Sequence, residues 1–152
     1  MATTDDKVVL LDTNVLLSAT ASLRPLHHAA LTTLNDWPNR GLVLAVSSQI
    51  LREYLVVATR PTEVNGLGLS TEDALTNVTA FRGRMRLLAD GEPVWDRLRS
   101  LVAADGCRGK QIHDANVVAC ALTSGVTKLA TANMGDFKRF AAEIELIDLA
   151  AL

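Results

Sequence analysis

The sequence predicts an α/β fold in which helices cover both faces of a central, mostly parallel sheet of about four or five strands. Short runs of Val, Leu and Ile alternate along the chain with longer segments whose apolar residues recur at helical spacing. The chain has 152 residues and contains neither an internal repeat nor a long linker. We therefore expect one domain that spans residues 1–152.

The expected elements follow one another in a regular alternation. Buried strands are predicted at residues 8–11, 42–46, 86–89, 128–131 and 143–147. Helices are predicted from residue 13, over 28–37, from the Ser47-Ser48 cap to residue 59, after the capping segment 70–73, and over 92–104 and 112–122. In a sheet of this kind ligands bind beyond the carboxyl ends of the strands, so residues that follow the strands are the first functional candidates.

Composition excludes several classes of protein. Apolar residues make up 49% of the chain and charged residues 21%, which is typical of a globular domain and not of a disordered one. The net charge is only −2, so a nucleic-acid partner would have to be held by a local cluster of cations. Of the 15 basic residues, 11 are Arg, whose planar side chain suits phosphate.

Two further absences indicate a cytoplasmic protein. The two cysteines, Cys107 and Cys120, have no zinc-like spacing, and we expect both as reduced thiols. The acidic start of the chain differs from a secretory signal, and no segment approaches the roughly 18 apolar residues of a membrane span.

Three acidic residues stand at positions where chemistry is expected. Asp12 directly follows the first strand, where a turn or capping role is the alternative. Glu53 lies at the margin of the apolar arc of its helix, where it could instead be an ordinary boundary residue. Asp114 lies in the first turn of an otherwise apolar helix, where the helix dipole offers a structural explanation worth roughly 0.3 to 1 kcal/mol.

A fourth group of polar residues follows the strand predicted at 128–131. Thr131, Asn133 and Asp136 place a hydroxyl, an amide and a carboxylate within six residues, although turn formation explains Asn133 equally well. Carboxylates brought together in a cleft destabilise one another unless a cation neutralises them. Oxygen ligands without Cys or paired His favour Mg²⁺ or Mn²⁺, and such a metal can activate water for phosphodiester hydrolysis.

With these residues in this order, the chain resembles the PIN-domain ribonucleases. The resemblance rests on the run from Leu11 to Leu16, on Glu53, on His113-Asp114-Ala115, and on Thr131-Ala132-Asn133 with Asp136-Phe137, and it spans almost the whole chain. Length and motif order are similar to the VapC toxins of bacterial toxin–antitoxin pairs. The resemblance implies Mg²⁺-dependent cleavage of RNA, a VapB-type antitoxin that caps the site, and a homodimer.

The same resemblance implies roles for individual residues. Asp12, Glu53, Asp114 and Asp136 would be the catalytic acids and the metal ligands, supported by hydrogen bonds from Thr13 or Thr131. The chain departs from the family pattern at Asn133, where many members carry an acid. Either Asp136 compensates for this, or a second metal binds weakly.

Contacts with RNA phosphates would come from local cations. The candidates are Arg82, Arg84, Arg86, Arg108 and Lys110, for each of which ordinary solvated surface is the alternative.

Three other functions stay open at this stage. A phosphohydrolase of the haloacid dehalogenase type would also place an Asp after the first strand, but it needs a second Asp where Asn14 stands. A phospho-receiver domain would need an Asp after Val46, which this chain lacks. An inactive PIN-like protein that serves as a binding module is compatible with Asn133.

Overall fold

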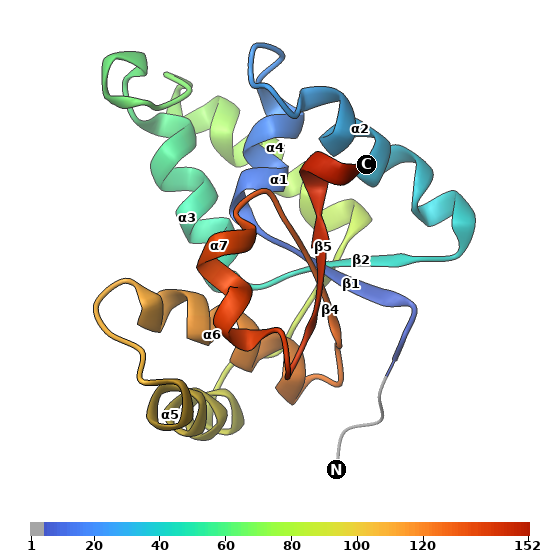
Figure 1. Ribbon diagram of the computed structural model, residues 1–152. Helices are drawn as coiled ribbons and strands as arrows, with labels where there is room; N and C mark the ends of the chain where they lie inside the picture. Colours follow the sequence, from blue (N-terminus) through green and yellow to red (C-terminus); the bar gives the residue numbers. More distant parts are fainter. Residues whose placement is uncertain (1–4) are drawn as a thin grey trace.

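The five strands found within residues 5–152 form one parallel sheet in the order β3-β2-β1-β4-β5 (Figure 1). The structure is a computed structural model that describes residues 5–152, so the part of the expected domain at residues 1–4 lies outside the described residues. The strands are β1 (Val8–Leu11), β2 (Val43–Val46), β3 (Arg86–Leu87), β4 (Lys128–Thr131) and β5 (Glu145–Asp148). The predicted parallel α/β fold is confirmed, and every strand pair in the sheet is parallel.

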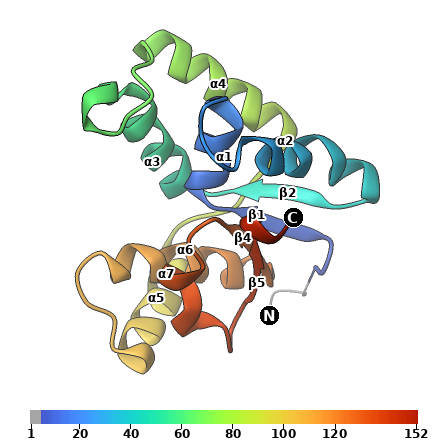
Figure 2. The same ribbon diagram turned by 45° about the horizontal axis from the view of Figure 1, so that its top comes forward.

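Helices cover both faces of the sheet, as both views show (Figures 1 and 2). One face carries α1 (Thr13–Thr20), α2 (His27–Asp36), α3 (Ser48–Thr59) and α4 (Thr71–Arg84). The other carries α5 (Glu92–Asp105), α6 (Gln111–Thr123) and α7 (Met134–Phe137). Short 3-10 turns complete the chain at Pro38–Arg40, Thr62–Val64, Lys138–Phe140 and Leu149–Ala151.

The core is built around β1, the central strand. All four of its residues have no exposed surface, because helices pack on both of its faces and strands pair with both of its edges. A strand buried in this way has no polar face, which explains why the run Val-Val-Leu-Leu does not alternate. Within residues 5–152 no helix has the length and apolar character needed to cross a membrane.

The order of the strands creates a switch point between β1 and β4. From β1 the chain moves outward through β2 to β3, and it then returns to the other side of β1 to form β4 and β5. The helices that follow β1 and β4 therefore diverge to opposite faces of the sheet (Figure 1). In sheets of this kind, ligands bind beyond the carboxyl ends of the strands at such a point. Asp12 follows β1 at this edge, and Thr131 is the last residue of β4.

Local sequence signals set the beginnings of α3 and α4. Ser47 caps α3 by accepting a hydrogen bond from the Ile50 amide at 3.3 Å, and Ser70 caps α4 through the Asp73 amide at 3.0 Å. The predicted start of the last strand was two residues early. The amides of Glu143 and Ile144 both donate to the carbonyl of Phe140, so the chain is still in a turn there.

Replacement of Ser47 by Ala tests the cap that begins α3. Ser47 is buried, so the Ile50 amide loses its partner without gaining water. We expect the free energy of unfolding to fall by about 1 kcal/mol, the usual effect of losing such a cap. Urea denaturation measures the change, with Ser22→Ala at an exposed position as the control. Equal midpoints for the two variants would contradict the assignment.

Candidate active site

Asp12 is the most buried of the acidic residues at the carboxyl edge of the sheet, with 7% of its surface exposed. Its Oδ1 accepts a hydrogen bond from the amide of Thr13 at 2.8 Å. Its Oδ2 accepts two more, from Asn14 Nδ2 at 3.1 Å and from Thr131 Oγ1 at 2.8 Å. The side chain is thereby fixed against both β4 and the start of α1.

Burial raises the pKa of Asp12 to about 6. The hydrogen bonds from Thr131, the Thr13 amide and Asn14 lower it, whereas the negative charge of Glu53 raises it. Burial has the larger effect, so Asp12 holds its charge at neutral pH at a cost in stability.

Glu53 projects from α3 toward the same edge of the sheet. Its Oε2 accepts a hydrogen bond from Thr13 Oγ1 at 2.9 Å, and its Oε1 accepts one from Gln49 Nε2 at 2.9 Å. Thr13 thus contacts one acid with its side chain and another, Asp12, with its amide. Two of the predicted acids are joined by a single supporting residue.

Asp114 lies in the first turn of α6 and is half-buried. Its pKa is raised to about 6 by burial and by the negative charges of Asp136, Asp12 and Glu53, while Lys110 lowers it. Within residues 5–152 its carboxylate accepts no hydrogen bond from another residue. Its charge is therefore not compensated by any hydrogen bond of the kind that holds Asp12 and Glu53.

The segment after β4 contributes Asp136 and Asn133. Asp136 is exposed in α7, and its charge acts on Asp114. Asn133 is also exposed. Its backbone amide donates to Thr131 Oγ1 at 2.9 Å, and the Thr131 hydroxyl in turn donates to Asp12. The structure thus brings all four predicted acids and the three supporting residues Thr13, Thr131 and Asn133 to one edge.

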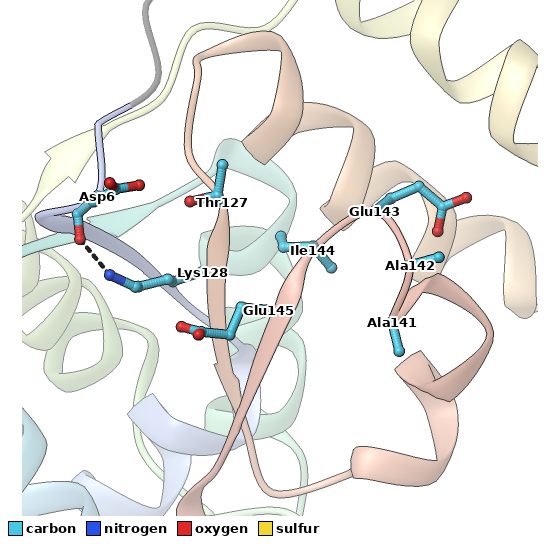
Figure 3. A pocket seen from close by; sticks show the side chains of 8 residues that line it. All are labelled: Asp6, Thr127, Lys128, Ala141, Ala142, Glu143, Ile144 and Glu145. Atoms are coloured by element: carbon cyan, nitrogen blue, oxygen red, sulfur yellow. Dashed lines mark hydrogen bonds between the residues drawn. The ribbon is translucent and has the colours of Figure 1, made fainter.

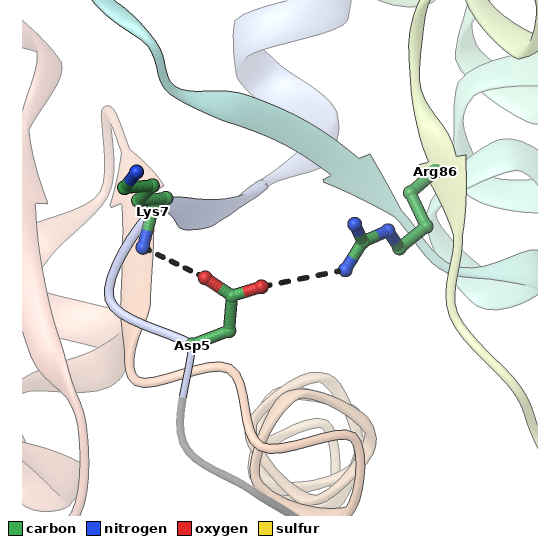
Figure 4. A network of polar contacts seen from close by, with 3 residues as sticks. All are labelled: Asp5, Lys7 and Arg86. Atoms are coloured by element: carbon green, nitrogen blue, oxygen red, sulfur yellow. Dashed lines mark hydrogen bonds and ion pairs between the residues drawn. The ribbon is translucent and has the colours of Figure 1, made fainter.

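The predicted cations divide into two groups. Lys110 and Arg108 lie in the turn that precedes α6, and Lys110 is close enough to Asp114 to influence its pKa. Arg84 instead donates to the carbonyl of Leu34 and to Asn35 Oδ1 at the end of α2. Arg86 pairs with Asp5 at 3.8 Å, and Figure 4 shows this contact beside the beginning of β1. The exposed Arg82 lies on α4.

Three side-chain amides at this edge were not among the predicted site residues. Asn14 donates to Asp12 and accepts the Ala132 amide at 3.0 Å, so it joins the ends of β1 and β4. Its place in the run Asp-Thr-Asn was a usable signal. Gln49 and Asn116 contact each other at 2.6 Å, and no local pattern in the sequence marks either of them.

The opposite edge of the sheet has a different character. A hollow of about 570 Å³ there is lined by Asp6, Lys128, Glu145 and neighbouring residues (Figure 3). Lys128 Nζ donates to the carbonyl of Asp6 at 2.6 Å, so its cation is already engaged. The buried and mutually repelling acids, with the raised pKa values of Asp12 and Asp114, are found at the carboxyl edge instead.

The carboxyl edge offers oxygen ligands and an excess of negative charge, which suit Mg²⁺ or Mn²⁺. In the described part of the chain, however, no three His, Cys, Asp or Glu side chains form a ready-made metal cage. Mg²⁺ is commonly held by one or two carboxylates and keeps several of its waters. The residues present fit that open mode of binding.

A parallel sheet with acids gathered at its switch point defines a class of α/β domains whose ligands bind beyond the carboxyl ends of the strands. The chain belongs to one family within this class, because the model of the PIN domain matches residues 9–143. A search of curated protein sequences finds no significant match.

Solved structures share the fold at low sequence identity. VapBC2 from Rickettsia felis, bound to a promoter DNA fragment, is 20% identical with a TM-score of 0.65, over 93% of this chain and 98% of its own. DNA-bound VapBC from Salmonella typhimurium is 20% identical with a TM-score of 0.64, over 98% and 99%. VapC20 from Mycobacterium tuberculosis, described as a toxin that cleaves the sarcin–ricin loop, is 14% identical with a TM-score of 0.64, over 90% and 95%.

The raised pKa values of Asp12 and Asp114 predict how stability depends on pH in the metal-free protein. Both values are about 6 in the folded protein, against an ordinary value of 3.8. Between about pH 4 and pH 6 the folded protein therefore holds protons that the unfolded chain has released. These groups make stability fall as pH rises through that window, and their effect is constant above about pH 7.

Asp114→Asn removes one of the two groups. We expect its unfolding free energy, relative to that of the natural protein, to increase as pH rises from 4 to 7, because the repelled charge is no longer created. Urea denaturation in EDTA from pH 4 to pH 8 measures this difference. Asp96→Asn at an exposed position of α5 is the control and should run parallel to the natural protein. A pH-independent difference for Asp114→Asn would contradict the prediction.

Proposed function

We propose that the chain is a Mg²⁺-dependent endoribonuclease that acts as the toxin of a bacterial toxin–antitoxin pair. One observation carries the proposal: four acids gather at the switch point of the sheet. The negative charges of Asp12, Glu53 and Asp136 all lie close enough to Asp114 to raise its pKa. Gathering carboxylates that have no cationic partner makes the fold less stable, since each negative charge makes it harder to ionise the others. A site for a divalent cation explains this arrangement.

The related structures support the choice of RNA and of the toxin role. VapC20 is described as a toxin that cleaves the sarcin–ricin loop, and others are described as VapBC or toxin–antitoxin complexes. This chain shares their fold over most of its length and belongs to the PIN family. Because the chain belongs to the PIN family, we no longer propose a phosphohydrolase of the haloacid dehalogenase type. The cleavage test below distinguishes an active nuclease from an inactive binding module.

The metal would be held by Asp12, Glu53, Asp114 and Asp136, directly or through water. When bound, Mg²⁺ would stabilise the negative charge that develops on the phosphodiester during in-line displacement. Thr131, Thr13 and Asn14 hold the Asp12 carboxylate in one orientation, because each donates a hydrogen bond to it. Asp114 has no such hydrogen-bond donor among the described residues, so its carboxylate could change orientation when the cation binds.

Substrate phosphates would be held by cations beside the acids rather than by the protein as a whole. Lys110 and Arg108 are exposed in the turn before α6. Lys110 lies close enough to Asp114 to lower its pKa, so this turn is well placed for phosphate contacts. Arg84 and Arg86 are engaged elsewhere, so we assign them no part in RNA binding. Arg82 stays a weaker candidate on α4.

The toxin role requires partners. A VapB-type antitoxin would have to cover the acidic site in the cell, because free nuclease activity harms the host. A homodimer is expected from the same family resemblance.

Cleavage of RNA is the direct test of the nuclease. The purified protein, incubated with total bacterial RNA and Mg²⁺ or Mn²⁺, should produce discrete cuts that EDTA abolishes, with mapped 5′ ends identifying the target. Asp114→Asn should lower the rate by roughly 10²-fold or more, because a ligand of the charge-stabilising ion is lost. Asp96→Asn should cleave normally. Metal binding without cuts by the natural protein would favour the inactive binding module.

Growth of bacteria tests the toxin role separately from the chemistry. Induced expression of the chain alone should arrest growth, whereas expression of Asp114→Asn to the same level should not. Colony counts after induction give the measure. Normal growth with the active protein would overturn the toxin role, and it would leave the nuclease in place if cleavage in vitro is seen.

A further inference from the structure

Gln49 occupies a position that the proposed site does not account for. It lies in the first turn of α3, one turn before Glu53, and only 5% of its surface is exposed. Its Nε2 donates to Glu53 Oε1 at 2.9 Å and to the carbonyl oxygen of His113 at 2.9 Å. Its Oε1 accepts a hydrogen bond from Asn116 Nδ2 at 2.6 Å. One side-chain amide therefore joins an acid of α3 to the first turn of α6.

The chemistry of the partners allows only one orientation of this amide. The Glu53 carboxylate and the His113 carbonyl can only accept hydrogen bonds, so the NH₂ group of Gln49 must face both of them. Its oxygen then faces Asn116, whose own NH₂ group must turn toward it. The orientations of both side-chain amides, Gln49 and Asn116, are therefore determined by their hydrogen-bond partners.

The sheet by itself does not fix the distance between Glu53 and Asp114. Glu53 lies on α3, which follows β2, whereas Asp114 lies on α6, which precedes β4. The strands β2 and β4 are not neighbours, because β1 lies between them. Gln49 closes this gap, since His113 precedes Asp114 and Asn116 follows it by two residues.

A neutral amide is also the right kind of group for this task. Lys or Arg at the same place would hold Glu53 equally well, but its charge would offset the negative charge that attracts a cation. Gln49 orients the carboxylate and leaves its full charge available. Thr13 does the same for the other oxygen of Glu53.

We infer that Gln49 and Asn116 form a positioning pair that sets the placement of Glu53 relative to Asp114 and so prepares the site for its divalent cation. This inference rests on the proposed function. The pair acts through Glu53 and the first turn of α6 and does not itself touch the substrate. Its loss should weaken cation binding more than it weakens the fold.

The test compares Gln49→Met and Asn116→Leu with Asn77→Leu in the full chain. Asn77 is a matched control for Asn116, because both are half-buried and each donates its Nδ2 to one side-chain oxygen. For Asn77 that oxygen is the hydroxyl of Tyr54, at 3.1 Å. Titration calorimetry with Mn²⁺ measures affinity, thermal denaturation measures stability, and RNA cleavage is followed against Mn²⁺ concentration. Asn116→Leu keeps the test decisive if Gln49→Met does not fold.

We expect Gln49→Met and Asn116→Leu each to bind Mn²⁺ roughly tenfold more weakly, the effect of losing one hydrogen bond near a charged group. Their cleavage rates should recover as Mn²⁺ is raised, and the double variant should bind little worse than either single one. Asn77→Leu should lose thermal stability and keep the natural affinity.

Natural Mn²⁺ affinity in folded Gln49→Met or Asn116→Leu would overturn the inference, as would an equal loss in Asn77→Leu. Either result leaves the proposed function intact, because the natural protein still binds and cleaves. If the natural protein neither binds Mn²⁺ nor cuts RNA, the proposed function fails and this inference fails with it.

Discussion

The arrangement of the site depends on one buried carboxylate, that of Asp12. It lies at the end of the central strand and accepts hydrogen bonds from the start of α1 and from the end of β4. Because the chain diverges to opposite faces at this switch point, the backbone alone would leave a crevice here. Asp12, Asn14 and Thr131 connect its two walls. Glu53 is joined to the same connection through Thr13, which donates a hydrogen bond to each of the two acids.

The groups that orient these acids are neutral. Thr13 and Gln49 hold Glu53, and the hydroxyl of Thr131 and the side-chain amide of Asn14 hold Asp12. Within residues 5–152, no Lys or Arg forms an ion pair with either of these two acids. Lys110, in the turn before α6, lies at its margin. Because the pKa values of Asp12 and Asp114 are raised in the folded protein, ionising these acids lowers the stability of the fold at neutral pH. A bound cation would recover that stability, since it favours the folded protein in which the acids are gathered.

Much of the fold was predictable because its signals are local. The alternation of apolar runs and the serine caps depend on neighbouring residues and gave elements close to those observed. The late start of β5 was missed because the turn at Phe140 is held by backbone hydrogen bonds that no residue type marks. Arg84 and Arg86 looked equivalent to Arg108 in the sequence. Their partners, Leu34 and Asp5, are distant along the chain and fix them away from the acids.

The sequence by itself determined that Asp12 would follow a strand, that Thr131 would end one and that Asp114 would lie in the first turn of a helix. Burial pattern and helix capping act over only a few residues, so each of these positions is set locally. Parallel strands then require Asp12 and Thr131 to meet at one edge of the sheet. Only the tertiary structure decided which neutral groups would orient the acids. The bond from Asn116 to Gln49 spans 67 positions and that from Thr131 to Asp12 spans 119, so each partner is chosen by packing and not by any local pattern.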